Sequence, residues 1–255
     1  MELWSLQHIK TLIPAILVML LLGAILRLTI GKKSEKIRMI PLKIIGVLLV
    51  LLEIGKQALS LQRGYDLYHL PFHYCSIYIF ALPVIAFYQG KYKNTVREVG
   101  SALTAALFLI MLIYPSLIYS GANIEEFFQD YFSMHTVVFH NLVMLAWVLM
   151  VALDIPEFGK AAIKPLVLFL GGFCVISATM AQLLQTNFAN FYSCNIPPLE
   201  NLRISLQGVL GYGFTQFLYV IIVSAVTVGF SLLFYGIGRL PRQLLNKMRS
   251  ANKVS

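Results

Sequence analysis

Apolar runs of about 20 residues, almost free of charge, recur along the whole chain. A helix rises about 1.5 Å per residue, so about 20 apolar residues are needed to cross roughly 30 Å of hydrocarbon. Charged residues make up 12% of the 255 residues and hydrophobic ones 58%, whereas a soluble domain has about 25% charged residues. The sequence also lacks the strand-type alternation of an outer-membrane barrel. We therefore expect an all-α integral membrane protein.

Seven such runs predict a seven-transmembrane-helix bundle within one domain, residues 1–240, followed by a basic cytoplasmic tail, residues 241–255. The first run is too long for the apolar region of a signal peptide and lacks its cleavage site, so it counts as a span. The longest connection, about 186–208, has room for a short re-entrant or interfacial piece. The predicted spans are about 11–30, 40–60, 71–89, 99–119, 135–153, 162–185 and 209–238.

The distribution of Lys and Arg predicts the orientation. Of the 20 basic residues, 16 fall in the first, third and fifth connections with their helix ends, or in the C-terminal tail. Under the positive-inside rule this side faces the cytoplasm, so the N-terminus lies outside and the C-terminus lies in the cytoplasm. We expect the net charge of +9 to serve topology and contacts with anionic lipid headgroups at the cytoplasmic face rather than nucleic-acid binding.

The second predicted span carries charge, which is costly inside a membrane and points to function. Glu53 is followed by Lys56 at i+3 and Gln57 at i+4, on nearly the same helix face. One interpretation is a self-paired Glu53–Lys56 couple that locks helix packing. The other is a polar wall for a cavity in the outer half of the membrane.

The third predicted span opens with Leu70-Pro71-Phe72-His73-Tyr74-Cys75-Ser76. Pro71 suits the first helical position, where a missing N–H costs nothing. Cys75 would then lie near the positive end of the helix dipole, which favours a thiolate, although apolar burial opposes it and an inert buried cysteine is the alternative. On a helix His73 would point about 200° away from Cys75 and would serve poorly as its base, unless the segment at 70–72 stays extended.

Polar residues of other spans are predicted to lie at the same depth. His135 and His140 open the fifth span, but positions five apart on a helix differ by about 140°, so we expect only one of them to face a small target. Gln182 and Asn187 end the sixth span, and Gln216 lies in the seventh. Their common depth on the outer side predicts a single outward-facing pocket.

The order of Glu53, the element from Leu70 to Ser76, His135-x4-His140 and Thr186-Asn187-Phe188 resembles the YwaF family of bacterial membrane proteins over roughly residues 40–230. That family is related to eukaryotic transmembrane acyltransferases that act on ether phospholipids. The family's aromatic G-P-W-P-W stretch is replaced here by the residues from Leu210 to Phe214.

The resemblance implies a lipid acyltransferase or lipase-like enzyme of the bacterial plasma membrane, with membrane lipids as partners and no cofactor. It implies Cys75 as the nucleophile and His140, or else His135, as the base. Further pocket residues expected to bind the substrate are Glu53, His73, Gln182, Asn187 and Gln216, with Asn187 or Gln182 as oxyanion donors.

The polar residues of the predicted pocket also fit other hypotheses. A non-catalytic transporter or solute-binding membrane subunit would use the polar residues to hold a small solute. A zinc site from His73, Cys75, His135 and His140 is disfavoured, because neither H-x-C nor H-x4-H is a common zinc spacing. A disulfide between Cys75 and Cys194, which lie on the same predicted side, would rule out thioester chemistry.

Overall fold

The computed structural model describes residues 4–155 and 162–251, and within these ranges it is helical with no strand. Lys160 and Lys253, two of the basic residues used to predict the orientation, lie outside them. The helices are α1 (Leu6–Ile30), α2 (Glu35–Arg38), α3 (Ile40–Gln62), α4 (Ile77–Phe87), α5 (Lys93–Ile113), α6 (Gly121–Glu125), α7 (Tyr131–Ala152), α8 (Ile163–Leu183), α9 (Pro197–Leu210) and α10 (Tyr212–Ala251). Short 3-10 turns are η1 (Leu67–His69), η2 (Tyr74–Ser76), η3 (Pro115–Leu117) and η5 (Phe188–Asn190).

Five helices of the described chain are long and apolar enough to cross a membrane: α1, α5, α7, α8 and the Tyr212–Ile237 part of α10. The protein is therefore an all-helical, multi-pass integral membrane protein. Each of the other two predicted spans also contains a helix. α3 has 23 residues but carries Glu53 and Lys56, and the third span holds a shorter apolar helix, Tyr74–Phe87. Seven crossings thus stay a prediction.

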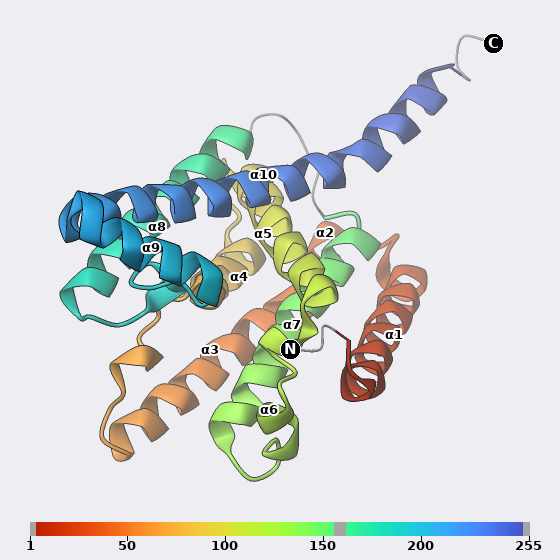
Figure 1. Ribbon diagram of the computed structural model, residues 1–255. Coiled ribbons are helices and arrows are strands. Elements are labelled where there is room, and N and C mark those ends of the chain that lie inside the picture. The colour runs from red at the N-terminus through yellow and green to blue at the C-terminus, as the bar shows by residue number, and fades with distance from the viewer. Residues whose placement is uncertain (1–3, 156–161, 252–255) are drawn as a thin grey trace.

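Helix α3 packs against α4 and α7, while α5 packs against α4, α7 and α10 (Figure 1). α1 packs against α7, and α8 and α9 lie along α10 (Figure 1). Apolar side chains fill the junctions because tight packing maximises dispersion contacts. The largest fully buried side chains include Leu12, Leu42, Leu49, Tyr78, Leu82, Leu103 and Met111.

The third span begins differently from the prediction. Leu70 (φ −61°, ψ 145°) and His73 (φ −78°, ψ 155°) have extended backbones, and the helix proper starts at Ile77, so placing Pro71 at the first helical position was wrong. The backbone of this segment is satisfied by side chains of neighbouring helices instead. Ser177 of α8 donates to the carbonyl of Phe72, and Gln57 of α3 donates to the carbonyl of His69.

The long connection before the last span contains helix α9, which turns back into α10 at Gly211. Gly211 has φ +79°, a conformation that glycine adopts without a steric penalty. No described side chain of α9 is buried, and four of its exposed apolar side chains, Leu199, Leu202, Leu206 and Val209, share one face, whereas the exposed Ile204 lies on another. The connection thus contains a short helix, and whether it is re-entrant or interfacial stays a prediction.

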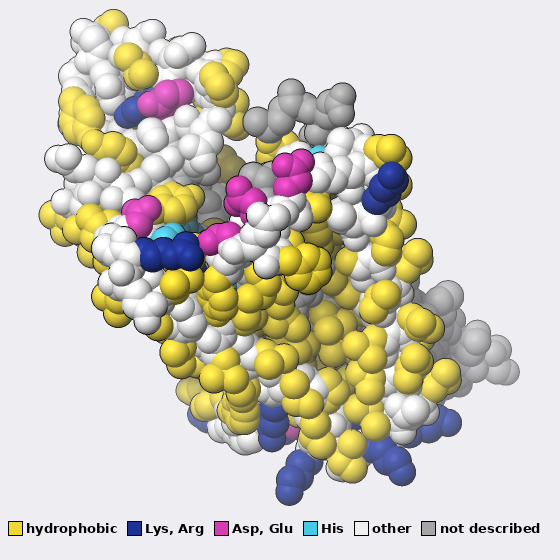
Figure 2. Space-filling model, turned by 90° about the horizontal axis from the view of Figure 1, so that it is seen from below, with side chains coloured by type: hydrophobic (Ala, Val, Ile, Leu, Met, Phe, Trp, Pro, Cys, Tyr) yellow, Lys and Arg dark blue, Asp and Glu magenta, His cyan; other side chains and the backbone are white. Residues whose placement is uncertain are grey.

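Charges separate along the molecule. Figure 2 shows Asp and Glu side chains gathered toward one end of a largely apolar surface, whereas Lys and Arg predominate at the opposite end. This is the asymmetry from which the orientation was predicted.

Candidate functional site

A cavity of about 410 Å³ opens between α3, α7, the segment before α4 and the loop that contains η5. It brings together six of the eight residues predicted for the site. They are Glu53, His73, Cys75, His135, His140 and Asn187. Gln182 and Gln216 do not line it.

Glu53 is the most highly connected side chain in the wall of this cavity. Its Oε1 lies 2.8 Å from Nζ of Lys56 and accepts a hydrogen bond of 2.7 Å from Nε2 of Gln57. Its Oε2 lies 3.4 Å from Nε2 of His135, a long electrostatic contact. The couple with Lys56 and the polar wall were considered as alternatives, and the structure contains both.

The two histidines of α7 both line the cavity, although only one was expected to face it. His135 stacks on Phe139 and points Nε2 at Glu53. His140 has Nδ1 2.6 Å from the carbonyl oxygen of Thr136. A carbonyl only accepts, so Nδ1 carries the proton and Nε2 keeps a lone pair. His140 is thereby fixed in the tautomer that a general base requires.

Cys75 lies in the turn η2, between the extended segment and α4, and lines the cavity. The extended backbone meets the condition under which His73 can share a site with it. Nε2 of His73 lies 2.9 Å from the carbonyl of Tyr68, so Nδ1 of His73 is the nitrogen with the lone pair. All three cysteines are within the described residues and are free thiols, so the disulfide with Cys194 is absent.

Sequence reasoning missed His69, which also lines the cavity. Its ring stacks on Phe132, and its Nδ1 lies 2.7 Å from Oγ of Ser60. Desolvation by burial lowers the pKa of His69 below its ordinary value, which favours the neutral form of the ring. The available signal was its position two residues before the predicted third span, beside the motif that was recognised.

Asparagines of the η5 loop form another part of the lining that was only partly predicted. Asn190 and Asn195 line the cavity with Asn187. Oδ1 of Asn187 accepts from the backbone N–H groups of Tyr192 and Ser193, which fixes its amide within the loop. Asn190 has φ +62°, a left-handed conformation that asparagine tolerates better than most residues.

Gln182 and Gln216 hold this loop in place by hydrogen bonds to its backbone. Both donate through Nε2 to the carbonyl of Phe191 at 2.9 Å, and Gln216 also accepts 2.8 Å from Nη1 of Arg203. Their amides are therefore occupied by protein groups, and their place in the structure supports positioning of the loop rather than contact with a substrate.

No group of three or more His, Cys, Asp or Glu side chains within residues 4–155 and 162–251 is arranged to hold a metal ion. The polar chemistry of the cavity instead consists of one thiol, four imidazoles, an ion pair and asparagine amides, above a floor of apolar side chains. The floor includes Ile79, Leu107, Ile110, Ile118 and Phe139.

Comparison with known proteins supplies the family. A search of curated proteins and a search of solved structures give no match. A model of the TMEM164 family matches residues 3–235, a range that includes every residue lining the cavity. The match covers nearly the whole chain, and the chain belongs to the TMEM164 family of transmembrane proteins.

Proposed function

We propose that this protein is a membrane-embedded lipid acyltransferase with Cys75 as nucleophile and His140 as general base. The observation that carries the proposal is the shared cavity of the thiol and an imidazole whose tautomer is fixed for accepting a proton. The resemblance of the residues around Cys75 to the YwaF family, and through it to ether-phospholipid acyltransferases, supports the same chemistry.

In the proposed reaction Nε2 of His140 takes the thiol proton of Cys75, and the sulfur attacks the ester carbonyl of a donor lipid. The C–S bond forms, the C–O bond breaks, and the leaving alkoxide receives the proton from the imidazolium. The hydroxyl of an acceptor lipid then attacks the thioester while the same nitrogen takes its proton. The acyl group passes to the acceptor, and the thiolate recovers the proton. The cycle requires no metal or nucleotide.

The remaining lining residues suit the needs of such a substrate. The amide nitrogen of Asn187 donates one of its two N–H groups to Oδ1 of Asn195 at 3.2 Å, and the other is the proposed donor of a hydrogen bond to the oxyanion. The apolar side chains of the floor would contact the acyl chain of the lipid. Lys56 and His73 would bind its polar headgroup. His135 already contacts Glu53, which makes it the weaker candidate for the base.

A lipid probe with a thiol-reactive head tests the nucleophile. We expect Cys75→Ala to abolish labelling while the variant still inserts and elutes as a folded protein in detergent. Cys194→Ala, which removes the other half-buried thiol, should label as the wild type does. His140→Gln should slow labelling about 100-fold and His135→Gln less. Full labelling of the Cys75→Ala variant would refute the proposal.

A solute-binding membrane subunit or transporter is the second candidate, and the charged wall formed by Glu53, Lys56 and His135 favours it. Tolerance of Cys75→Ser together with a strict requirement for Glu53 in a growth or uptake assay would support this candidate. Loss of function in Cys75→Ser together with lipid labelling at Cys75 would support the enzyme.

We further propose that the seven helices α1, α3, α4, α5, α7, α8 and α10 all cross a bacterial plasma membrane, with the N-terminus outside. The Lys and Arg asymmetry supports this orientation. Impermeant maleimide applied to intact cells should label a cysteine placed at Gly121, in the outer connection, and should not label one placed at Lys33. Labelling of the Lys33→Cys variant alone would reverse the orientation.

A further inference from the structure

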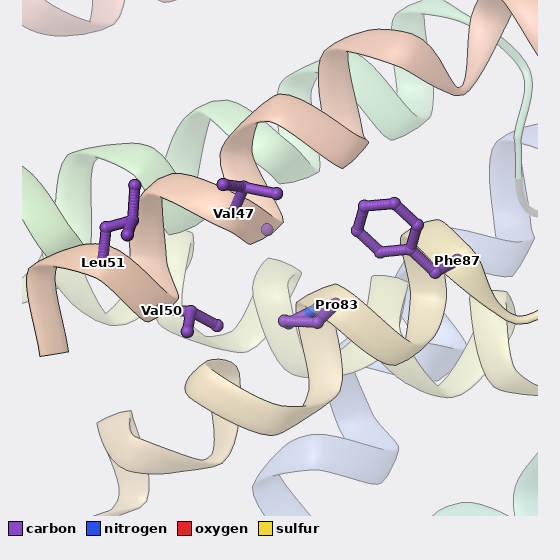
Figure 3. A pocket seen from close by; sticks show the side chains of 6 residues that line it. Val47, Val50, Leu51, Pro83 and Phe87 are labelled. Atoms are coloured by element: carbon purple, nitrogen blue, oxygen red, sulfur yellow. The ribbon is translucent and has the colours of Figure 1, made fainter. Parts of the chain in front are cut away.

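A second recess lies between α3 and α4, on a different part of α3 from the cavity that holds Cys75. It has a volume of about 180 Å³ and is lined by Gly46, Val47, Val50, Leu51, Pro83 and Phe87. Figure 3 shows Val47 and Phe87 on opposite sides of the recess, with Pro83 between the two helices. All of its lining side chains are apolar, and it shares no lining residue with the larger cavity.

The recess exists because the two helices approach closely at one point and part beside it. A Cβ atom at Gly46 would lie 3.3 Å from Cα of Pro83, so the absence of a side chain allows the approach. On the molecular surface beside this contact, the side chain of Val47 is 46% exposed and that of Phe87 is 50% exposed. In a membrane protein such surfaces face acyl chains, so the recess opens toward lipid.

A cation lies at the edge of this recess. Nζ of Lys43 is 5.6 Å from the centroid of the Phe87 ring, which forms one wall. Lys43 is half-buried, and it has no carboxylate partner among the described residues.

Four basic side chains at the same end of the molecule have protein oxygens as partners. Lys93 and Arg97 bind Glu35, and Arg27 binds Asp154. Arg38 donates to the carbonyl of Leu153. Lys43 differs from these four because its ammonium group is free to bind an external anion. It differs from the exposed Lys33, which also has no carboxylate partner among the described residues, because it lies beside the recess.

We infer that this recess is a binding site for an anionic glycerophospholipid of the membrane. One acyl chain lies against Val47, Val50 and Phe87, and the lipid phosphate binds the ammonium of Lys43. A short apolar slot that ends at a lone cation matches a molecule in which a chain and an anion are joined at a fixed distance. The site is independent of the proposed acyl transfer.

Native mass spectrometry of the full chain, purified in detergent, tests the site. The protein is mixed with phosphatidylglycerol or with phosphatidylcholine of the same acyl chains, and the retained lipids are counted. The wild type should retain phosphatidylglycerol in preference. Lys43→Gln should lower that preference about fivefold, the effect of one Lys near a lipid headgroup. The matched control Lys33→Gln, an exposed basic residue at the same end, should leave it unchanged.

Substitutions that fill the recess with a larger side chain provide a second test of lipid binding. Val47→Phe should lower retention of both lipids, whereas Val175→Phe, at a position of α8 that is 67% exposed, should not. An unchanged preference in Lys43→Gln would overturn the inference. So would an equal loss of preference in Lys33→Gln, or equal effects of the two Phe substitutions, because these would indicate nonspecific adsorption.

Discussion

At the scale of single residues, Glu53 and Lys56 form a buried ion pair in the wall of the cavity. Their side chains are only 10% and 14% exposed, so each charge depends on the other for compensation. Removing one member of a buried pair costs more than the pair itself contributes, because the remaining charge stays desolvated.

We expect Glu53→Gln to lower the free energy of unfolding by about 3 kcal/mol. The double variant Glu53→Gln with Lys56→Met should recover most of this loss, since no uncompensated charge is left. Glu125→Gln, at an exposed position, is the control and should change it by less than about 0.5 kcal/mol. Denaturant titration in detergent measures all three. A double variant no more stable than the single one would show that Glu53 acts through Gln57 or His135 instead.

At the scale of elements, the contact between α3 and α4 depends on a single glycine. Gly46→Ala would place a Cβ atom 3.3 Å from Cα of Pro83, a backbone atom that cannot rotate away. We expect a loss of about 1 kcal/mol in unfolding free energy. Gly172→Ala in α8 adds the same methyl group where nothing lies within 4 Å, and it should stabilise the helix by up to about 1 kcal/mol. Equal melting temperatures for the two variants would argue against the close approach.

The loop between α8 and α9 depends on a different kind of support. Arg203 of α9 binds Glu200 and also donates to Oε1 of Gln216, whose Nε2 holds the carbonyl of Phe191. The hydrogen bonds with Arg203 lower the pKa of Glu200, so this carboxylate is charged at neutral pH.

We therefore predict that Arg203→Met loosens the loop that carries Asn187, Asn190 and Asn195. Hydrogen–deuterium exchange should rise across residues 187–195 while the amides of α7 stay protected. Ser205→Ala, on the same helix at an exposed position, should leave the exchange pattern as in the wild type. Unchanged exchange in Arg203→Met would mean that Gln182 and Gln216 suffice to hold the loop.

At the scale of the whole molecule, Glu35 joins distant parts of the chain. It binds Arg97 at 2.8 Å and Lys93 at 3.1 Å, and thus ties α2 to α5. The hydrogen bond from Arg97, followed by that from Lys93, lowers the pKa of Glu35 to about 2 from an ordinary value of 4.5.

A carboxyl group whose pKa is lower in the folded state stabilises the fold above its unfolded pKa and loses that contribution as the pH falls through its folded pKa. The difference in melting temperature between the wild type and Glu35→Gln should therefore be constant at neutral pH and shrink between about pH 4.5 and about pH 2. Thermal unfolding in detergent at several pH values measures it. A difference that persists unchanged at pH 2 would exclude the ion pairs as its source.

Hydropathy predicted where the helices lie, because a segment in hydrocarbon must satisfy its backbone N–H and C=O groups by hydrogen bonds within its own helix. The same logic failed at Pro71, where side chains of Gln57 and Ser177 satisfy the backbone from other helices. Such contacts join residues up to 105 positions apart in the sequence, so the local sequence pattern cannot predict them. The lining of the cavity could be predicted where polar residues lie inside apolar spans, because they are unusual there. His69 and Asn190 were missed because they lie in connections, where polar residues are common.

The bond from Ser177 to the carbonyl of Phe72 has a mechanical consequence. Phe72 precedes Cys75 by three residues, just before the turn η2, whereas His135 and His140 belong to α7. A shift of α8 would therefore act through this bond on the segment that carries the thiol, whereas His135 and His140 are held by a different helix. The separation of the Cys75 sulfur from these two imidazoles therefore depends on the packing of α8 as well as on α4 and α7.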